Sequence, residues 1–335
     1  PFILQFIIAG GIIFVLSWLL AKAVTKWSIR WATERQLIAE VNERSSHTMP
    51  TPRVGGIGLM AGFLAGVLVL GGALIFPEQT PLIIRPVTGE VWAITWAQWG
   101  GLLAAVLLAF GLGFWDDQSN PPATAKLLGQ LVIAIIPPVC GVRVEQIHVP
   151  GMSAYATFPT WLSLGVSAFW ILLVMNAVNF MDGINGLAGK FAFWTGAFSL
   201  IAVIQYAGGE PVLVLSVALM GASQGFLAHN IPQAKTFMGD CGSQPLGLIA
   251  ALMGILITTI PTTQPLPLLG FVLIVSVFLY DVIYTLIKRA LGGRNLLTAH
   301  REHLYQRFLI AHGEDHGQTL RFVENTMVVT GICGA

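Results

Sequence analysis

Charged residues are scarce in this sequence: Asp, Glu, Lys and Arg make up 10% of its 335 residues, while hydrophobic residues make up 55%. In a soluble domain, charged residues usually account for about 25%. This composition, with a mean hydropathy of +0.75, excludes a soluble protein and indicates an integral membrane protein. The net charge is only +1 and the basic residues are spread along the chain, so we expect no nucleic-acid partner.

Cysteine is also rare. The three cysteines, Cys140, Cys241 and Cys333, are widely spaced and odd in number, which excludes a disulfide framework and a zinc motif. We expect all three to be packing residues.

Ten apolar segments are long enough, or nearly long enough, to cross a membrane. They cover roughly residues 2–22, 54–76, 97–115, 126–141, 160–178, 187–206, 211–229, 243–261, 267–288 and 321–335. They predict an all-α fold, a polytopic bundle of membrane helices that forms a single domain over residues 1–335. Because Pro1 stands in place of an initiator Met and the last segment stops at Ala335, we expect the natural chain to be longer at both ends, with one more span.

The distribution of Lys and Arg predicts the orientation of these spans. If the N-terminus faces outward, all but two of the 17 basic residues fall in inward loops, the exceptions being Arg85 and Arg143. Cytoplasmic loops carry an excess of Lys and Arg, so we expect the N-terminus outside. The outward loops look structural: residues 76–95 contain several prolines, and residues 141–160 alternate in a way that suggests a short hairpin.

Four polar clusters follow apolar segments, and this orientation places all of them on the cytoplasmic side, at residues 116–126, 176–190, 230–243 and 294–307. In the second cluster, Asn176, Asn179 and Asp182 are spaced by three residues, which places them on one face of a helix at the edge of a span. Polar groups there are costly unless they have a function. A Gly-rich turn with capping residues would explain this run alone, but the recurrence favours one shared active-site cleft.

The acidic residues of these clusters suit a divalent cation. Two adjacent carboxylates, Asp116 and Asp117, repel each other unless a cation or a proton offsets their charge. Asp240, Asp182 and the amide oxygen of Asn179 are oxygen ligands of the kind that Mg²⁺ prefers. Simple interfacial anchoring is the alternative for any one pair of acids.

The basic and glycine-rich parts of the clusters suit phosphate. Lys126, Lys190, Lys235 and Arg301 can neutralise phosphate, and the turns at 183–186 and 239–243 can bring backbone N–H groups close to it. His300 and His303 lack a clear third ligand for zinc, so we interpret them as phosphate contacts. Together these groups predict phosphoryl transfer.

The chain resembles the polyprenyl-phosphate N-acetylhexosamine-1-phosphate transferase family, or glycosyltransferase family 4, which includes the phospho-MurNAc-pentapeptide translocases. The resemblance follows the chain in order, through Thr51-Pro52-Arg53-Val54-Gly55-Gly56, Phe114-Trp115-Asp116-Asp117, the run from Asn176 to Gly189, the run from Asn230 to Asp240, and the cluster at His300.

This resemblance implies the transfer of a sugar-1-phosphate from a UDP-sugar to undecaprenyl phosphate, which releases UMP, with Mg²⁺ (or Mn²⁺) bridging the diphosphate. Asp240 and Asn179 match the family's metal ligands. The expected catalytic residues are Asp116, Asp117, Asp182, His300 and His303; the expected substrate-binding residues are Lys126, Asn185, Asn230, Lys235, Phe237, Arg301 and Arg53. The expected partners are the UDP-sugar, undecaprenyl phosphate and membrane lipids, with no nucleic acid; a homodimer stays open.

The loop from Arg294 to Arg307 looks more like the O-antigen initiating branch than the triple-histidine loop of the translocases. We therefore expect UDP-GlcNAc or a related UDP-HexNAc as donor, a role in cell-surface glycan synthesis such as lipopolysaccharide or cell wall biogenesis, and the bacterial inner membrane as location. We also expect this loop to set sugar selectivity, the alternative being a basic helix at the lipid surface. A phospho-MurNAc-pentapeptide transferase and a membrane transporter are the alternative functions, although charged groups deep in several spans, typical of transporters, are almost absent.

Overall fold

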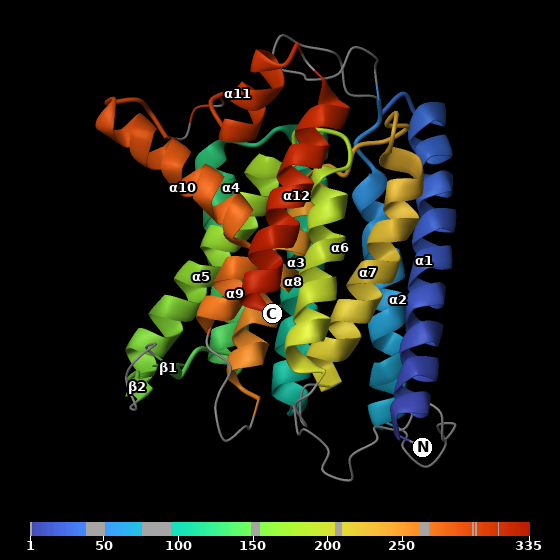
Figure 1. Ribbon diagram of the computed structural model, residues 1–335, viewed down its shortest axis with the longest axis vertical. Coiled ribbons are helices and arrows are strands. Elements are labelled where there is room, and N and C mark those ends of the chain that lie inside the picture. Colours follow the sequence, from blue (N-terminus) through green and yellow to red (C-terminus); the bar gives the residue numbers. More distant parts are fainter. Residues whose placement is uncertain are drawn as a thin grey trace.

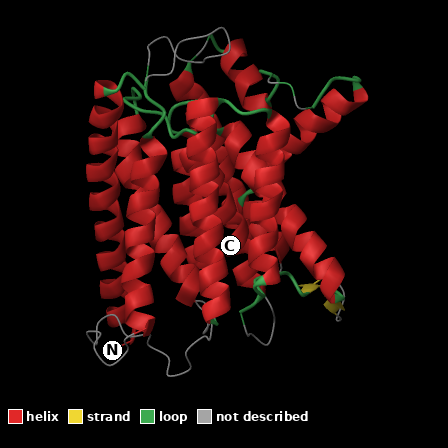
Figure 2. Cartoon of the chain, turned by 180° about the vertical axis from the view of Figure 1, so that it is seen from behind, coloured by secondary structure: helices red, strands yellow, loops and turns green. Residues whose placement is uncertain are grey.

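The computed structural model describes residues 2–37, 51–75, 95–148, 155–204, 210–260, 268–296, 298, 300–313 and 315–335. This part of the chain is a bundle of helices with one short two-stranded ribbon (Figures 1 and 2). The helices are α1 (Phe2–Glu34), α2 (Gly55–Ile75), α3 (Trp96–Ser119), α4 (Ala123–Val139), α5 (Thr160–Met181), α6 (Leu187–Val203), α7 (Glu210–Asn230), α8 (Asp240–Thr258), α9 (Leu268–Ile274), α10 (Ser276–Leu291), α11 (Leu304–Ala311) and α12 (His316–Gly334); the strands are β1 (Gln146–His148) and β2 (Tyr155–Thr157).

The predicted all-α membrane fold is confirmed, because a helix overlaps each of the ten apolar segments. The number of spans stays a prediction. By length and composition, the described residues contain five helices that can cross a membrane, or six if the bent pair α9 and α10 counts as one span. Helices α4 and α6 are apolar but shorter, and of α2 only the part Gly55–Leu68 is fully described. Helix α12, which carries Arg321 and Glu324, is not among the candidates. The chain is a multi-pass membrane protein.

Helix α8 lies at the centre of the bundle. It packs against α3 and α5, while α1, α2 and α7 form a group on one side (Figure 1). The whole apolar window of α8 is buried by its neighbours, which agrees with a sequence of small and aliphatic residues without a polar face. The first residue of this helix, Asp240, is therefore fixed by packing on several sides.

Different elements lie at the two ends of the bundle. The N-terminus and the β1–β2 ribbon lie at one end, and α11 lies at the other, where α12 begins (Figure 1). The predicted hairpin is confirmed: Ile147 pairs with Ala156 in an antiparallel register. Of the other outward loop, predicted at 76–95, all but Thr95 lies outside the described residues.

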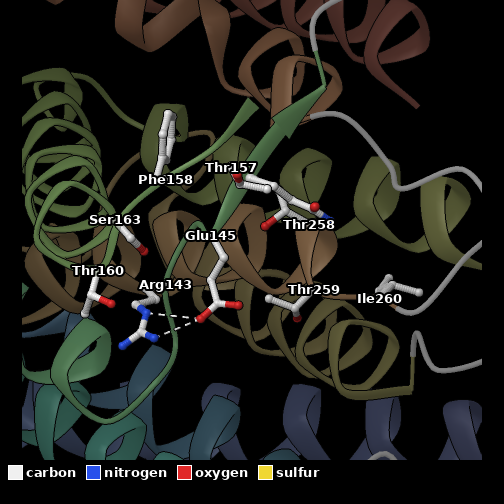
Figure 3. Close-up of a pocket in the computed structure, with 10 residues that line it drawn as sticks. Arg143, Glu145, Thr157, Phe158, Thr160, Ser163, Thr258, Thr259 and Ile260 are labelled. Atoms are coloured by element: carbon white, nitrogen blue, oxygen red, sulfur yellow. Dashed lines mark hydrogen bonds and ion pairs between the residues drawn. The ribbon is translucent and has the colours of Figure 1, made fainter. Parts of the chain in front are cut away.

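A cavity of about 510 Å³ opens beside the ribbon, between the start of α5 and the end of α8 (Figure 3). Arg143 lies in it and forms an ion pair with Glu145, at 2.9 Å between Nη2 and Oε1. None of the residues expected in the active site lines this cavity, so it is separate from the chemistry predicted at the opposite end.

The segment predicted as one span at 267–288 is broken. Helices α9 and α10 meet at Val275 and differ in direction by 80°. As a result α10 leans away from the bundle (Figure 1), and the next helix, α11, contacts α12. A short helix therefore occupies part of the expected loop at 294–307.

Candidate active site

Lys126, in the first turn of α4, lies where three other helices bring oxygen atoms together. Its Nζ is 3.1 Å from Oδ2 of Asp116, at the end of α3, and 3.2 Å from Oδ1 of Asn179, in the last turn of α5. It also bonds Oδ2 of Asp240, at the start of α8. The structure thus joins three of the predicted clusters at one point. The side chains of Lys126 and Asp240 keep 19% and 22% of their surface exposed, so a ligand can reach them.

Asp117 performs a different task from its neighbour Asp116. Its two carboxylate oxygens accept hydrogen bonds from the backbone N–H groups of Asp240 and Cys241, both at 2.9 Å. The first N–H groups of a helix have no partner within the helix and carry partial positive charge. Asp117 therefore caps α8 and fixes the backbone of Asp240, although the sequence predicted a catalytic role for it.

Two glycines allow this cap to form. A Cβ on Gly113 would lie 2.0 Å from the carbonyl oxygen of Asp240, so only glycine lets α3 approach the start of α8 so closely. Gly239 has a positive φ of 71°, and a Cβ there would lie 2.7 Å from Oδ2 of Asp117. Glycine adopts such a backbone conformation readily. Larger residues at either position would separate Asp117 from the helix that it caps.

Uncharged amides lie behind the acids. Gln130 of α4 donates to Oε1 of Gln244 of α8 at 2.8 Å and accepts from Nδ2 of Asn176 of α5 at 3.0 Å. Asn179 also donates to the hydroxyl of Ser243 at 2.9 Å, which leaves its Oδ1 directed to Lys126. Buried amides are stable only when they are hydrogen-bonded. The network therefore fixes the relative positions of α4, α5 and α8. Gln130 and Gln244 were not among the predicted site residues, although each is a polar residue inside an apolar segment.

Asp182 follows α5 directly and lies beside the same acids. Burial and the negative charges of Asp240 and Asp117 raise the pKa of Asp182 to about 8, while Arg53 and a hydrogen bond from the backbone N–H of Gly239 oppose this shift. Without a cation, Asp182 is therefore mostly protonated at neutral pH. A positive charge placed among these acids would ionise it.

The segment from Thr51 to Gly56 pairs with residues 236–238 like two strands. The N–H of Phe237 donates to the carbonyl of Pro52, and the N–H of Gly55 donates to the carbonyl of Phe237, both at 2.9 Å. Asn230, expected as a substrate contact, is 4% exposed. Its Oδ1 accepts from the N–H of Gly186 at 2.6 Å and its Nδ2 donates to the carbonyl of Thr236 at 2.8 Å. It thus ties together the two loops that carry Asp182 and Asp240.

The histidine cluster is attached to α10 by an acid that the sequence analysis did not identify. Asp281 is 4% exposed, and its Oδ1 lies 2.9 Å from Nδ1 of His303. The rings of His300 and His303 are 4.9 Å apart between centroids. Burial, His303 and Arg289 lower the pKa of His300, which favours a neutral imidazole. In the sequence, Asp281 could have been noticed as the single Asp of the apolar segment 267–288.

The remaining predicted residues lie in less defined positions. Lys235 is exposed and Asn185 is partly buried. Phe237 and Arg301 are partly buried, and both make further interactions within the protein. Lys190, expected at phosphate, instead pairs with Glu324 of α12 at 2.9 Å.

The oxygen atoms around Lys126 fit a hard cation. Two carboxylates and one amide oxygen converge there, and Mg²⁺ typically takes one or two protein carboxylates and completes its shell with water and phosphate. Within the described ranges, no three His, Cys, Asp or Glu side chains gather as a group that could hold a metal, so water and substrate oxygens would have to complete the shell of a cation here. Lys126 already shows that this point attracts a positive charge.

The fold and the site together define a class: a multi-pass membrane protein with a partly exposed polar site at one end of its bundle. A family model described as glycosyl transferase family 4 matches residues 99–258. The decaprenyl-phosphate N-acetylglucosaminephosphotransferase of Mycolicibacterium smegmatis is 30% identical over 317 residues, covering 87% of this chain and 74% of that protein. The chain belongs to this family of transferases.

Two further relatives have related names. The probable undecaprenyl-phosphate N-acetylglucosaminyl 1-phosphate transferase of Bacillus subtilis is 28% identical over 309 residues, covering 90% of this chain and 78% of that protein. The phospho-N-acetylmuramoyl-pentapeptide-transferase of Corynebacterium jeikeium is 32% identical over 319 residues, covering 82% of this chain and 81% of that protein.

Proposed function

We propose that the protein transfers an N-acetylhexosamine-1-phosphate from a UDP-sugar to a polyprenyl phosphate, undecaprenyl phosphate in the first instance, and releases UMP. The observation that carries this proposal is the convergence of Asp116, Asn179 and Asp240 on one cationic group. The names of the relatives support a polyprenyl-phosphate acceptor and an N-acetylglucosamine phosphate.

Asp240 and Asn179, with Asp116, would hold Mg²⁺ at this point. When bound, the cation supplies positive charge that offsets the negative charge of the diphosphate. Lys126 is long and flexible, so its ammonium can move from these oxygens to a phosphate oxygen of the substrate.

The transfer proposed is a direct displacement. An oxygen of the lipid phosphate attacks the sugar-linked phosphorus, the bond from that phosphorus to the bridging oxygen breaks, and UMP leaves with that oxygen. We assign to Asp116 the role of positioning the acceptor or taking its proton, because both carboxylate oxygens of Asp117 accept hydrogen bonds from the start of α8. Such help from a general base is typically worth about 10²–10⁴-fold.

The direct route excludes a phosphorylated enzyme. Incubating the protein with UDP-sugar that is radiolabelled in the sugar, in the absence of lipid, should leave no label on the protein after denaturation. A sugar phosphate bound covalently to an aspartate, with release of UMP, would instead show a two-step mechanism.

The loop at residues 294–307 and the charges around it also bear on the choice of UDP-sugar and on the side of the membrane that the site faces. Residues 294–307 carry His300, Arg301 and His303. Guanidinium groups bind phosphate oxygens in a bidentate manner, so this loop is proposed to hold the diphosphate and, beside it, to select the sugar. The excess of Lys and Arg at this end of the bundle supports a cytoplasmic site in a bacterial inner membrane.

A panel of donors tests the proposal. Purified protein is incubated with undecaprenyl phosphate, Mg²⁺ and one donor at a time from UDP-GlcNAc, UDP-GalNAc and UDP-MurNAc-pentapeptide, and lipid products are identified by mass spectrometry. We expect a diphosphate-linked N-acetylhexosamine. A product only with UDP-MurNAc-pentapeptide would assign the activity named for the corynebacterial relative, and no product with any donor would refute the proposal.

A further inference from the structure

The start of α11 is held by one buried carboxylate. Oδ1 of Asp281 accepts the N–H of Leu304 at 2.9 Å, and Oδ2 accepts the N–H of Tyr305 at 3.0 Å. The carboxylate therefore occupies the place of an N-terminal helix cap, but it comes from a different helix. It fixes where α11 begins relative to α10.

The same carboxylate orients the ring of His303. Oδ1 of Asp281 lies 2.9 Å from Nδ1 of His303, and an ionised carboxylate can only accept hydrogen bonds. In the tautomer that makes this bond, Nδ1 donates and the carboxylate accepts. His303 is 3% exposed, and its ring packs against that of Phe180, with 5.9 Å between centroids. The orientation of the ring is thus determined on two sides.

The segment fixed by Asp281 contacts the active-site loop. The hydroxyl of Tyr305 donates to the carbonyl of Phe180 at 3.3 Å. A Cβ on Gly183 would lie 1.9 Å from that hydroxyl, so Tyr305 touches the backbone on both sides of Asp182. Phe180 directly follows Asn179. The contacts therefore lead from α10 to the loop that carries two of the acid-site residues.

The other half of the histidine loop is held from the same helix. Arg289 of α10 is 5% exposed, and its guanidinium bonds Glu302 at 2.7 Å and the carbonyl of Asn295 at 2.7 Å. Two buried charges on one helix, two turns apart, thus hold the loop near its beginning and at its end. A buried charge is costly unless its partners are well placed. Movement of the loop away from Asp281 and Arg289 would leave these buried charges without partners, so a loosely held loop is unfavourable.

We propose that Asp281 is a positioning residue for the transferase, which holds His303 and the start of α11 against residues 180–183 so that the donor end of the site keeps one geometry. This inference rests on the proposed function. Asp281 touches no reacting atom; it acts through His303 and Tyr305.

Asp281→Asn tests this role. The amide has nearly the same size, but one of its two polar atoms is an NH₂ group, which cannot accept the N–H that the carboxylate accepts. Thr285→Ala is the matched control, because the buried Thr285 hydroxyl donates to Asp281 at 3.3 Å, and its removal leaves the carboxylate that accepts from Leu304 and Tyr305 in place.

Steady-state kinetics should separate positioning from simple loss of folded protein. For Asp281→Asn we expect the KM for the UDP-sugar to rise at least about tenfold while the KM for the lipid phosphate is unchanged, because only the donor end loses its geometry. A fall in kcat alone, with both KM values unchanged, or a variant that matches Thr285→Ala, overturns the proposal.

A double-mutant cycle tests whether Asp281 acts through His303. In a His303→Gln background, adding Asp281→Asn should change the KM for the UDP-sugar by less than about twofold, because coupled residues are not additive. The full effect of Asp281→Asn in that background would overturn the proposal.

Limited proteolysis keeps this test separate from the proposed function. Trypsin should cleave after Arg301 faster in Asp281→Asn than in Thr285→Ala, whereas cleavage after the exposed Arg294 should be similar in both, because only the anchored end of the loop is released. If the wild type makes no product, the proposed function fails and this measurement alone decides: equal cleavage after Arg301 in both variants overturns the positioning role.

Discussion

Asp116 and Asp117 are adjacent in the sequence, yet the structure gives them opposite tasks, and replacing each by Asn separates the two. Asp117 caps α8 with two hydrogen bonds of 2.9 Å to backbone N–H groups, whereas Asp116 contacts the ammonium of Lys126. Asp117→Asn should therefore lower stability. Asp116→Asn should abolish activity and leave stability nearly unchanged.

The magnitude for Asp117→Asn follows from its bonds. A hydrogen bond to a charged group contributes about 1.5–3 kcal/mol, and the amide can replace only one of the two acceptors, without its charge. Loss of the negative charge at the start of α8 removes a further ~0.3–1 kcal/mol of helix-dipole stabilisation. Relief of repulsion with Asp240, whose charge is largely offset by its ion pair with Lys126, returns about 1 kcal/mol of this. The net loss is about 1–3 kcal/mol, or roughly 2–6 °C in Tm at about 2 °C per kcal/mol for a long chain.

The assay is thermal unfolding of purified protein in one detergent, followed by intrinsic fluorescence at a fixed scan rate, because irreversible unfolding makes the apparent Tm depend on scan rate. Asp116→Asn is the matched control, since it removes the same charge from the next residue. A Tm for Asp117→Asn within about 1 °C of the wild type, or an equal fall in both variants, would refute the separation of roles.

Three further expectations follow from the same contacts. Asn230→Ala leaves the buried N–H of Gly186 and the carbonyl of Thr236 without their partner, so it should destabilise the protein by about 1–3 kcal/mol for each group and lower the apparent Tm more than Asp117→Asn does. The pKa of Asp182 in the folded protein is about 8, raised from 3.8, so between these pH values the folded protein binds one proton more than the unfolded chain and loses stability as the pH rises. In chelator, the Tm of the wild type should therefore fall between pH 6 and pH 9 more than the Tm of Asp182→Asn does. Parallel pH profiles of Tm would contradict this. Gly113→Ala places a Cβ against the carbonyl of Asp240 and should reduce both Tm and kcat, whereas Gly111→Ala on the same helix, where a Cβ meets nothing within 4 Å, should change neither.

Much of the architecture was readable in the sequence because hydropathy determines where membrane helices lie. Apolar segments gave the helices, and the recurrence of polar groups at segment ends correctly predicted that Asp116, Lys126, Asn179 and Asp240 would meet. Such a prediction needs only the alternation of helix direction, which places the ends of successive helices on the same side of the bundle.

Other features depend on three-dimensional contacts that spacing does not encode. The sequence treated Asp116 and Asp117 as one acidic pair, because only the direction of each side chain from α3 separates the cap from the cation site. Asp281 was overlooked as one acid in an apolar segment; its partners follow 22 to 24 residues later and reach it only because α9 and α10 are bent. The bonds of Asn230 and Lys190 within the protein are likewise not encoded in spacing, and their expected contacts with substrate stay a prediction.

One measurement addresses the proposed reaction and its site together: the yield of UMP and of lipid-linked sugar diphosphate from UDP-GlcNAc and undecaprenyl phosphate, compared between the wild type, the wild type in excess chelator, and Asp240→Ala. The wild type with Mg²⁺ should form the two products in equal amounts, and the other two reactions should form neither, since diphosphate and several carboxylates need a hard cation between them. Undiminished product in chelator or in Asp240→Ala, or UMP without a lipid-linked diphosphate, would contradict the assignment of the reaction to this site.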